Sequence, residues 1–394
     1  MKKFKKLSIA ISVVLVIGLL SSCSTYDNFK AAFFGDAKTS DTIKIGIYEP
    51  QTGADSEKGK LEIMGIELAK ELYPEVLGKK IELIYADTQS SIYTAETAIQ
   101  DLILKKPAVI LGSYGEAASL VASSYILESK IPSITISTTN PLITVNNDYY
   151  FRMCFLESTQ GESLAQYAVE GLRANTFGVI KVKNDDTTSP IIRKFTSRIK
   201  KLTDRDDNIA STVEVDPDAL DYSDYLLKVY QSGATAVFMP VTLTIAENVF
   251  KKADELKLYN VTFLGTKDWE SEDFIKMAAK YPKIKFAIAS EYNKNVGSTE
   301  TADQFLDAFK EKYGEAAEPE TATALAYDAY VLAIKSIEKA KTVESTSLRD
   351  TLAVTKNFDG AAGQISFNSI GDPKKPINID VLRNGKFVTI YTVE

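Results

Sequence analysis

Short apolar runs alternate with amphipathic stretches along most of this chain, and the pattern is clearest in one central unit. Residues 108–111 and 132–136 have the length of buried strands, and residues 117–129 between them have the pattern of a helix. This order predicts a βαβ unit whose strands lie parallel, because the crossover returns the chain to the same edge. Ligands of such sheets lie beyond the carboxyl ends of the strands. Residues 112–116 and 137–140 follow those ends; either loop alone is equally consistent with turn chemistry, but together they favour a small-molecule site.

The alternation predicts an α/β fold with two parallel-sheet lobes. One βα series leads up to and includes this unit, and a second, of similar length and with no residue-level repeat, follows it. Expected strands are 42–48, 80–85, 177–182, 210–215, 236–239, 261–264 and 286–289, and expected helices are 59–72, 92–104, 160–172, 191–202, 245–256, 301–313 and 321–340. A tail of short strands, 358–367, 377–382 and 386–391, is expected to pack on an existing sheet, with a hairpin turn at Asn384 and Gly385.

Composition narrows the chemistry that such a fold can carry. The 394 residues include no histidine and two cysteines, and the formal net charge is −7. Zinc sites and histidine general bases are thereby excluded, and with them most hydrolase mechanisms, so no metal and no cofactor is expected. An acidic chain also argues against nucleic acid as a partner, because that partner needs positive surface. A chain of this length exceeds one ordinary core, so two domains are expected.

The amino terminus has the pattern of a lipoprotein leader. Residues 1–22 carry four lysines and then an apolar run, which is typical of a signal peptide and too short for a membrane span. The sequence LSSC at residues 20–23 resembles the lipobox of bacterial lipoproteins, which implies cleavage before Cys23 and a lipid on its sulfur; a chance cysteine is the alternative. Residues 23–40 then form a tether. Because Cys154 is the remaining cysteine, no intramolecular disulfide is expected.

Several segments, taken in order, resemble one known family. They are IKIGIYEPQTGADSEKGKLEIMGIELA at residues 43–69, LGSYGEAASLVAS at 111–123, KIPSITISTTNPLIT at 130–144, AYDAYVLAIKSIEKA at 326–340 and FDGAAGQISFN at 358–368. This order resembles the leucine, isoleucine, valine-type periplasmic binding proteins, which are solute receptors of ATP-binding-cassette (ABC) importers. The resemblance implies the type I Venus-flytrap fold: two Rossmann-like parallel-sheet lobes joined by three crossings, with a ligand in a cleft that hinge motion closes.

The resemblance also implies how the chain divides. Crossings are expected near Glu157, Ser290 and Asp359. Lobe one then contains residues 41–157 with 290–358, and lobe two contains residues 158–289 with 359–394.

Candidate ligand contacts follow from the same resemblance. In amino-acid binders of this family, lobe one holds the ligand carboxylate through backbone N–H groups and hydroxyls, and lobe two supplies an aromatic residue and an acid for the ammonium group. Asp186 stands in place of the aromatic residue, so stacking specificity does not transfer. The matching positions are Tyr114, Gly115, Glu116, Ser137 and Thr139 in lobe one, and Asp186, Thr242, Lys267, Asp268 and Trp269 in lobe two.

Two matching positions depart from the family pattern. Glu116 stands where the family has a carboxylate-binding serine, and a buried carboxylate facing a ligand carboxylate is disfavoured. Lys267 stands where the family has its acid, with Asp268 one place later. Three explanations stay open: a one-residue shift in which Asp268 binds the ammonium group and Ser113 or Ser119 the carboxylate, a ligand without the amino-acid head group, or a Glu116–Lys267 pair that bridges the closed cleft.

Other residues have a structural explanation. Arg152 follows an apolar run and is expected in a structural ion pair. Tyr327 and Asp328 favour packing over cleft contact. Trp269 is equally consistent with a core position and with a cleft contact.

The leading hypothesis is a monomeric receptor, lipid-anchored in the cell envelope, that delivers an amino acid or related polar solute to ABC permease and ATPase subunits. The alternative keeps the fold but makes the protein a receptor or sensor for an amide, urea-like or signalling compound. An enzyme has little support, because the chain has no histidine and no G-x-S-x-G nucleophile elbow.

Overall fold

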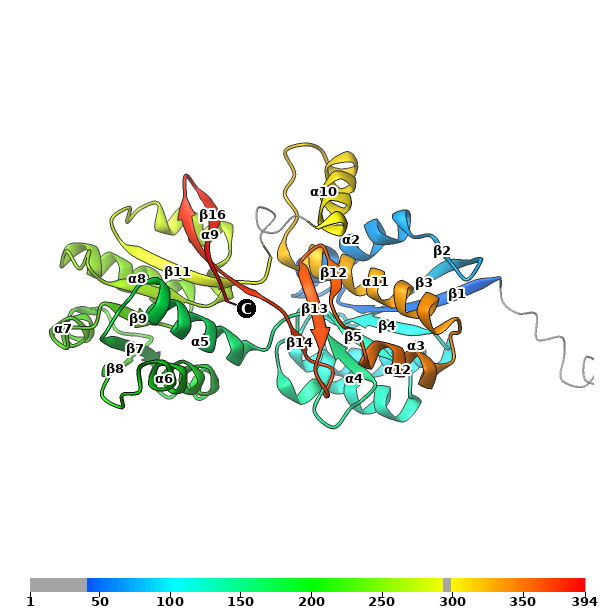
Figure 1. Ribbon diagram of the computed structural model, residues 1–394, viewed down its shortest axis with the longest axis horizontal. Helices are drawn as coiled ribbons and strands as arrows, with labels where there is room; N and C mark the ends of the chain where they lie inside the picture. The colour runs from blue at the N-terminus through cyan, green and yellow to red at the C-terminus, as the bar shows by residue number, and fades with distance from the viewer. Residues whose placement is uncertain (1–40, 293–298, 394) are drawn as a thin grey trace, which may run out of the picture.

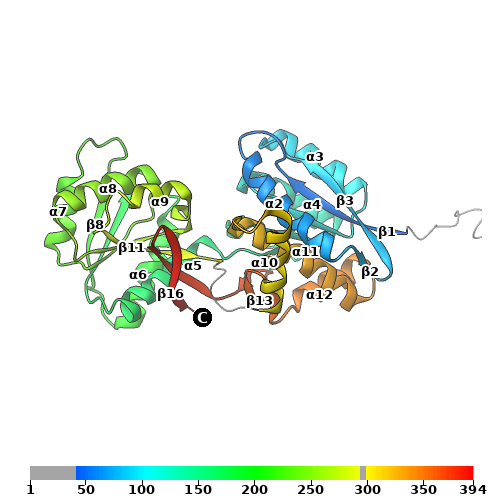
Figure 2. The same cartoon turned by 90° about the horizontal axis from the view of Figure 1, so that it is seen from above.

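The computed structural model describes residues 41–292 and 299–393. It is an α/β structure in which two lobes lie side by side, each with a central sheet and flanking helices (Figure 1). The view from above shows the same two bodies joined by a few chain segments (Figure 2). The predicted fold class, two parallel-sheet lobes, is confirmed. The predictions for the signal peptide, for Cys23 and for the tether lie outside the described residues.

The sheet of lobe one has the strand order β2-β3-β1-β4-β5-β6. Its central strands pair in parallel, and the short β2 is antiparallel to β3. β4 and β5 are neighbours, as the predicted βαβ unit requires. The strands are β1 (Thr42–Glu49), β2 (Glu75–Val76), β3 (Lys79–Asp87), β4 (Val109–Gly112), β5 (Ser133–Thr135) and β6 (Tyr150–Arg152).

The strand side chains of lobe one alternate between two helical layers. Ile45 joins a core with α2, α10, α11 and α12, whereas Tyr48 and Ile110 join a core with α3 and α4. Gly65 lets α2 approach α11, because a Cβ there would lie 2.1 Å from the Thr323 carbonyl oxygen. The helices are α2 (Ser56–Leu72), α3 (Ile92–Leu104), α4 (Glu116–Ser129), α10 (Glu300–Tyr313), α11 (Thr321–Ala340) and α12 (Ser345–Ala353), with the 3₁₀ turn η1 (Pro141–Ile143).

The sheet of lobe two has the order β16-β15-β11-β10-β9-β7-β8. Its strands pair in parallel from β11 to β8, and the antiparallel hairpin of β15 and β16 extends it. The predicted hairpin turn at Asn384 and Gly385 is confirmed, with both residues at positive φ. The strands are β7 (Phe177–Val182), β8 (Ile209–Val215), β9 (Ala236–Phe238), β10 (Thr262–Gly265), β11 (Lys285–Ser290), β15 (Ile377–Arg383) and β16 (Lys386–Val393).

Lobe two also has a helical layer on each face of its sheet. Val179 joins a core with α5 and α6, and Ile180 joins a core with α7, α8 and α9. The expected helix 160–172 changes at Tyr167 into a π-helical turn. The elements are α5 (Glu157–Gln166), η2 (Tyr167–Gly171), α6 (Ser189–Thr203), α7 (Ser223–Gln231), α8 (Leu243–Glu255), η3 (Lys267–Trp269) and α9 (Glu272–Ala278).

Two of the three crossings lie within a few residues of Glu157 and Ser290. Cys154 belongs to the core of lobe one and Phe155 to that of lobe two. The chain returns after β11, since Tyr292 packs in the core of lobe one.

The third crossing lies later than the expected position near Asp359. A small antiparallel sheet packs on lobe one, where Ile365 and Phe367 are buried in the core. Residues 359–374 therefore belong to lobe one and not to lobe two, because their apolar side chains face that core. The expected strand 358–367 is also divided in two. The three strands are β12 (Phe358–Gly360), β13 (Gly363–Phe367) and β14 (Pro373–Lys374).

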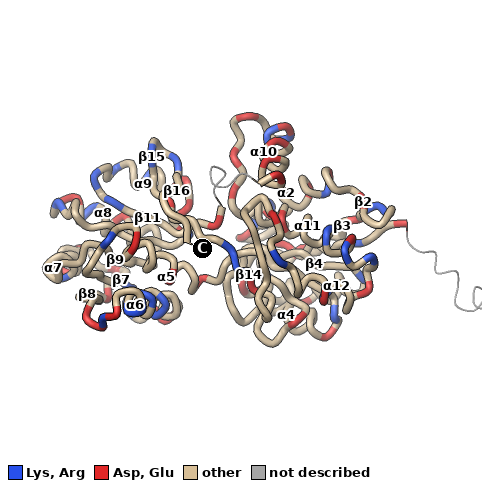
Figure 3. The backbone as a smooth tube through the Cα atoms, viewed as in Figure 1, with Lys and Arg blue, Asp and Glu red and all other residues tan. Residues whose placement is uncertain are grey.

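Acidic and basic residues are interspersed over both lobes (Figure 3). Within the described ranges, no helix combines the length and the apolar character that crossing a membrane requires.

Candidate functional site

The first polar loop of lobe one is fixed against the end of β1. β4 ends at Gly112, and α4 begins at Glu116 with Gly115 as its N-cap residue. Gly112 has φ 112°, and a Cβ there would lie 2.2 Å from a carbonyl oxygen of β1, so only glycine allows this close approach. The Tyr114 N–H donates to Oε2 of Glu49 at 2.7 Å. The backbone that carries the predicted ligand contacts is therefore held in place.

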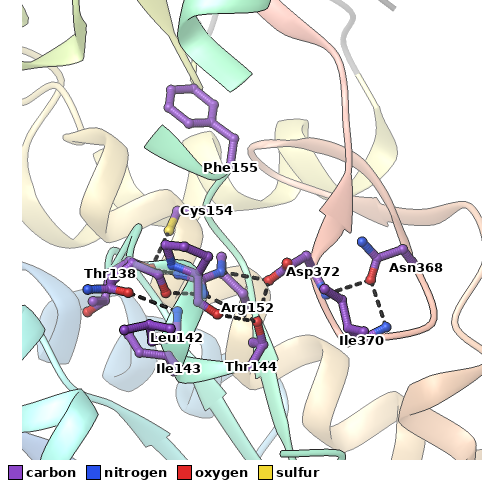
Figure 4. Close-up of polar contacts among 12 residues, drawn as sticks. Thr138, Leu142, Ile143, Thr144, Arg152, Cys154, Phe155, Asn368, Ile370 and Asp372 are labelled. Carbon is purple, nitrogen blue, oxygen red and sulfur yellow. Dashed lines mark hydrogen bonds and ion pairs between the residues drawn. The ribbon is translucent and has the colours of Figure 1, made fainter. Parts of the chain in front are cut away.

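The second polar loop is held from behind by a buried arginine (Figure 4). Arg152 on β6 is fully buried, and its Nε lies 2.9 Å from Oδ1 of Asp372. Its guanidinium also donates to the carbonyl oxygens of Thr138 and, at 2.6 Å, of Asn140. The expected structural ion pair at Arg152 is thus confirmed, and it fixes the backbone of residues 137–140.

The hydroxyls of Ser113 and Ser119 are used inside lobe one. Ser113 donates to the Tyr114 carbonyl oxygen at 2.7 Å, and Ser119 donates to the Ser113 carbonyl oxygen at 3.1 Å. Both serines are fully buried. This arrangement contradicts the explanation in which either serine presents its hydroxyl to a ligand carboxylate.

Two buried carboxyl groups lie behind the loops. Glu49 ends β1 and Glu62 lies on the buried side of α2, and both are 0% exposed. Burial and the neighbouring Glu62 raise the pKa of Glu49 well above its usual value, and burial also raises the pKa of Glu62. The two carboxyl groups lie against each other, and the Ser137 hydroxyl lies beside that of Glu62. The pair therefore retains at least one proton near neutral pH.

Lobe two presents Lys267 to the same region. β10 ends at Gly265, and in the next turn the Lys267 N–H donates to Oε1 of Gln160 at 2.8 Å. The Lys267 ammonium lies 5.4 Å from the centroid of the Phe155 ring and 3.8 Å from Oε2 of Glu291, and its side chain is 24% exposed. Burial opposes its charge, but Glu291 and other nearby groups outweigh burial and raise the pKa of Lys267. This side chain therefore stays cationic.

Charges from the two lobes act on one another here. Burial raises the pKa of Glu62 in lobe one, and Lys267 of lobe two lowers it in part, as does the nearby Ser137 hydroxyl. Burial and then Glu62 raise the pKa of Tyr114, on which Lys267 and Asp268 also act. Glu62 is therefore within electrostatic range of Tyr114 and Ser137 of lobe one and of Lys267 of lobe two.

Glu116 lies at the exposed rim of this region, where the Asn140 side-chain amide donates to it. In the part of the chain that the structure describes, no ion pair joins Glu116 to Lys267, which has a different acidic partner. Burial, then Asp268, then Glu116 raise the pKa of Glu157, so the rim is acidic. The proposed bridge between Glu116 and Lys267 is not formed in this conformation.

Trp269 lies in the core of lobe two and not at the site. It is fully buried, its Nε1–H donates to the Val241 carbonyl oxygen at 2.8 Å, and its ring stacks on Phe274 at 5.3 Å. Of the two expected positions of Trp269, the core and the cleft, the structure shows the core. The ring packs there because the apolar surface and the indole N–H both find partners.

The remaining predicted contacts are peripheral. Asp186 is exposed in the turn after β7, and Thr242 is exposed at the N-cap position of α8. Thr139 is half-buried in the second loop. The packing predicted for Tyr327 and Asp328 is confirmed, since both are fully buried in lobe one.

The sequence reasoning missed Glu49, Glu62 and Glu291. Glu62 had a signal, because it occupies the apolar face of the expected helix 59–72, four residues before Ile66. Glu49 directly follows the first strand, at the carboxyl edge where sites form. Over the described residues, no group of three or more side chains is arranged to hold a metal ion.

The fold and this region together are those of a two-lobe binding protein, in which polar loops follow the carboxyl ends of parallel strands in each lobe. Comparison with known proteins supports the same class of protein. Residues 42–377 match the model of the periplasmic binding protein family, and the chain belongs to this family. It is therefore a solute-binding protein of the kind that serves ABC transporters outside the cytoplasm, a family of binding proteins and not of enzymes.

Three relatives illustrate the similarity. The Leu/Ile/Val-binding protein homolog 2 of Brucella abortus (strain 2308) is 22% identical over 84% of this chain and 87% of its own. The branched-chain amino acid transporter substrate binding protein LivJ of Streptococcus pneumoniae, solved in complex with isoleucine, is 26% identical with a TM-score of 0.72, covering 89% of this chain and 99% of its own. A solute binding protein of an ABC transporter from Rhodopseudomonas palustris BisB5, in complex with 3,4-dihydroxy benzoic acid, shares the fold at 21% identity and a TM-score of 0.70, covering 90% and 98%. The resemblance seen in the sequence is confirmed.

Proposed function

We propose that this protein is the receptor of an ABC importer for a small polar solute, namely an amino acid of the branched-chain type or a related compound. The observation that carries the proposal is the position of polar residues after parallel strands of both lobes, namely the loops 112–116 and 137–140 in lobe one and Lys267 and Asp268 after β10 in lobe two. The similarity to binding proteins for leucine, isoleucine and valine supports the same class of solute.

The solute binds where the carboxyl edges of the two sheets converge, and the lobes close over it about the three crossings. Closure removes water from the polar groups around Glu62, which strengthens each hydrogen bond and ionic contact with the solute. The site lies at the ends of strands in both lobes, so neither lobe alone completes it. The solute therefore binds most tightly to the closed form, in which both lobes contact it.

The closed form delivers the solute to permease and ATPase subunits in the membrane. In this proposal residues 1–22 direct export, a lipid on Cys23 anchors the protein to the cell envelope, and residues 23–40 act as a tether. The receptor acts as a monomer.

A second candidate is a receptor or sensor of the same fold for a ligand that is not an amino acid. Lys267 favours it, because a cation stands where the resembled family has the acid that pairs with the ammonium group. An organic acid without an amine would satisfy Lys267 alone. Uptake of the identified ligand by cells that carry the importer genes separates the two roles, since a sensor does not support transport.

A thermal-shift screen of the full-length protein tests the proposed function. The panel holds the twenty standard L-amino acids, polyamines, amides and aromatic carboxylates. A solute bound only by the folded state raises the melting temperature, by an amount that corresponds to about 2.7 kcal/mol at one hundred times its Kd. We expect one or more amino acids to do so. A shift with carboxylates alone supports the second candidate, and no shift with any compound contradicts both.

A further inference from the structure

We propose that the ion pair between Lys386 of lobe two and Glu318 of lobe one holds the empty receptor open. Closure of the lobes separates the pair, and the loss of this contact lowers the affinity for the solute. The inference goes beyond the proposed function and rests on it in one respect, namely that a bound solute closes the lobes.

The two side chains of this pair come from different lobes. Lys386 begins β16, directly after the hairpin turn, and Glu318 lies in the connection between α10 and α11. The Lys386 ammonium lies 2.8 Å from Oε1 of Glu318, and the two side chains are 69% and 49% exposed. The pair therefore links the lobes at the surface, where either side chain can be replaced without leaving a cavity in a core.

The polar loops of lobe one are not linked to lobe two in this way. Residues 112–116 and 137–140 form their hydrogen bonds within lobe one, for example from the Tyr114 N–H to Glu49 and from Asn140 to Glu116. Across the described ranges, no hydrogen bond or ion pair joins either loop to a residue of lobe two. The lobes thus touch at Lys386 and Glu318 and stand apart at the loops, as in an empty, open receptor.

Strand order places the pair across the crossings from the loops that face the solute. In lobe two, β11 leads into the second crossing, β15 follows the third, and the two strands are neighbours. β10, with Lys267 and Asp268 after it, lies on one side of these two strands, and β16 lies on the other. Figures 1 and 2 agree, since α4, which follows the first polar loop, lies on the opposite side of the molecule from β16 and α10. Rotation about the crossings that brings Lys267 toward lobe one therefore carries β16 away from it.

The strand register gives the distance of Lys386 from the crossings. Ser290 at the end of β11 pairs with Asn378, and Lys386 pairs with Arg383, five residues further along β15. At about 3.4 Å per residue, Lys386 lies about 17 Å from the end of β11. A rotation of about 15°, as in known rigid-body transitions, moves a group at that distance by about 4 Å. Such a movement takes the ammonium out of hydrogen-bonding distance of Glu318.

A second contact between the lobes lies at the crossings themselves. Glu270 accepts the Thr321 hydroxyl at 3.3 Å and the hydroxyl of Ser290, the last residue of β11, at 3.2 Å. A group beside the axis of rotation moves little, so this contact persists when the lobes close. Of the two contacts, the pair of Lys386 and Glu318 is the one that distinguishes the open form from the closed form.

An exchange of charges tests this role. Lys386→Glu turns the attraction into repulsion, and the double variant of Lys386→Glu with Glu318→Lys restores the attraction with the charges reversed. Calorimetry uses the full-length protein and the compound with the largest shift in the thermal screen, whether amino acid or carboxylate. Lys60→Glu is the matched control, because Lys60 lies 2.8 Å from Oε1 of Glu57 in an exposed pair within α2.

We expect Lys386→Glu to bind the solute at least threefold more tightly, because the open form loses a contact that the closed form does not have. A fivefold gain corresponds to about 1 kcal/mol, which is the most that an exposed pair usually contributes. The double variant should return to within twofold of the unmodified protein, and Lys60→Glu should bind like it.

Unchanged or weaker binding by Lys386→Glu would overturn the inference. A double variant that keeps the full gain would also overturn it, since the gain would then not depend on the pair. Urea unfolding of the same proteins without solute tests the contact independently: Lys386→Glu should lose stability and the double variant should recover it. If neither happens, the contact does not form and the inference is wrong. Failure of the proposed function is recognised separately, because the unmodified protein then binds no compound of the panel.

Discussion

Glu291 is the residue on which the three crossings converge. Its Oε1 accepts the Phe155 N–H of the first crossing and the Lys375 ammonium of the third, and Glu291 itself directly follows β11 in the second. The side chains of Glu291 and Lys375 are each 1% exposed. A buried carboxylate with a backbone donor and two cations can hold these segments in one arrangement, because its charge is compensated within the cluster.

Replacing Glu291 with glutamine should destabilise the protein. The amide still accepts the Phe155 N–H but leaves the buried Lys375 without its counter-charge, and breaking such a pair costs about 3–5 kcal/mol. Urea unfolding followed by circular dichroism measures the loss, with Glu315→Gln at an exposed position as the control. A free energy of unfolding equal to that of the parent would show that the cluster does not stabilise the crossings.

Glu270 gives stability a pH dependence. Its carboxyl accepts the hydroxyls of Ser290 at 3.2 Å and Thr321 at 3.3 Å, and burial, followed by Asp380, raises its pKa to about 8. Because this pKa is higher in the folded chain than its usual value of 4.5, the folded state binds more protons, and its stability falls as pH rises between the two values. We expect Glu270→Gln to reduce this decline, measured as urea midpoints from pH 5 to pH 9.

Glu272→Gln, at an exposed position of α9, is the matched control and should retain the full decline. A Glu270→Gln variant that follows the parent at every pH would exclude Glu270 as the titrating group.

At the scale of elements, periodicity predicted the alternating strands and helices but not every short helix. α7, α9 and α12 have 9, 7 and 9 residues, and too few turns to establish an apolar face in the sequence. Residues 358–374 have an apolar pattern, but this pattern does not show on which of the two lobes the segment packs. The sequence predicted a site at the ends of β4 and β5, but it did not indicate Glu49 and Glu62, because only the folded chain shows that these two carboxyl groups are buried side by side.

The Arg152–Asp372 pair connects β6, the second polar loop and the segment before the third crossing. Arg152→Met removes the guanidinium from four acceptors, namely Asp372, the carbonyl oxygens of Thr138 and Asn140, and the Thr144 hydroxyl, and it leaves a buried carboxylate. We therefore expect a loss of about 3–5 kcal/mol in the free energy of unfolding. Solute affinity should also fall, because the backbone of residues 137–140 loses its support. The double variant with Asp372→Asn should recover part of the stability, and urea unfolding of all four proteins gives the coupling.

If the losses of the Arg152 and Asp372 single variants simply add in the double variant, with no recovery of stability, the two side chains are not directly coupled. Arg349→Met, whose Nη1 pairs with the exposed Asp148 at 2.8 Å, is the comparison for a surface pair and should cost at most about 1 kcal/mol.

At the scale of the whole molecule, polar contacts link the lobes. Besides Glu270 with Thr321, Lys386 of β16 lies 2.8 Å from Glu318 of lobe one, with both side chains well exposed. Exposed pairs contribute at most about 1 kcal/mol each, so a change in the angle between the lobes costs little. The sequence could predict two lobes from their βα series, but their placement depends on these weak contacts, which no periodicity encodes.

Such lobes should close when the solute binds. Small-angle X-ray scattering of the full-length protein should show a lower radius of gyration at saturating amino acid, in parallel with the rise in melting temperature. Lys267→Gln should lose both responses together, because the lobe-two contact is what converts binding on lobe one into closure. Lys276→Gln, at an exposed position of the neighbouring α9, should keep both. A higher melting temperature with an unchanged radius of gyration would mean that the solute is held by one lobe alone, and the coupling of binding to closure would then be wrong.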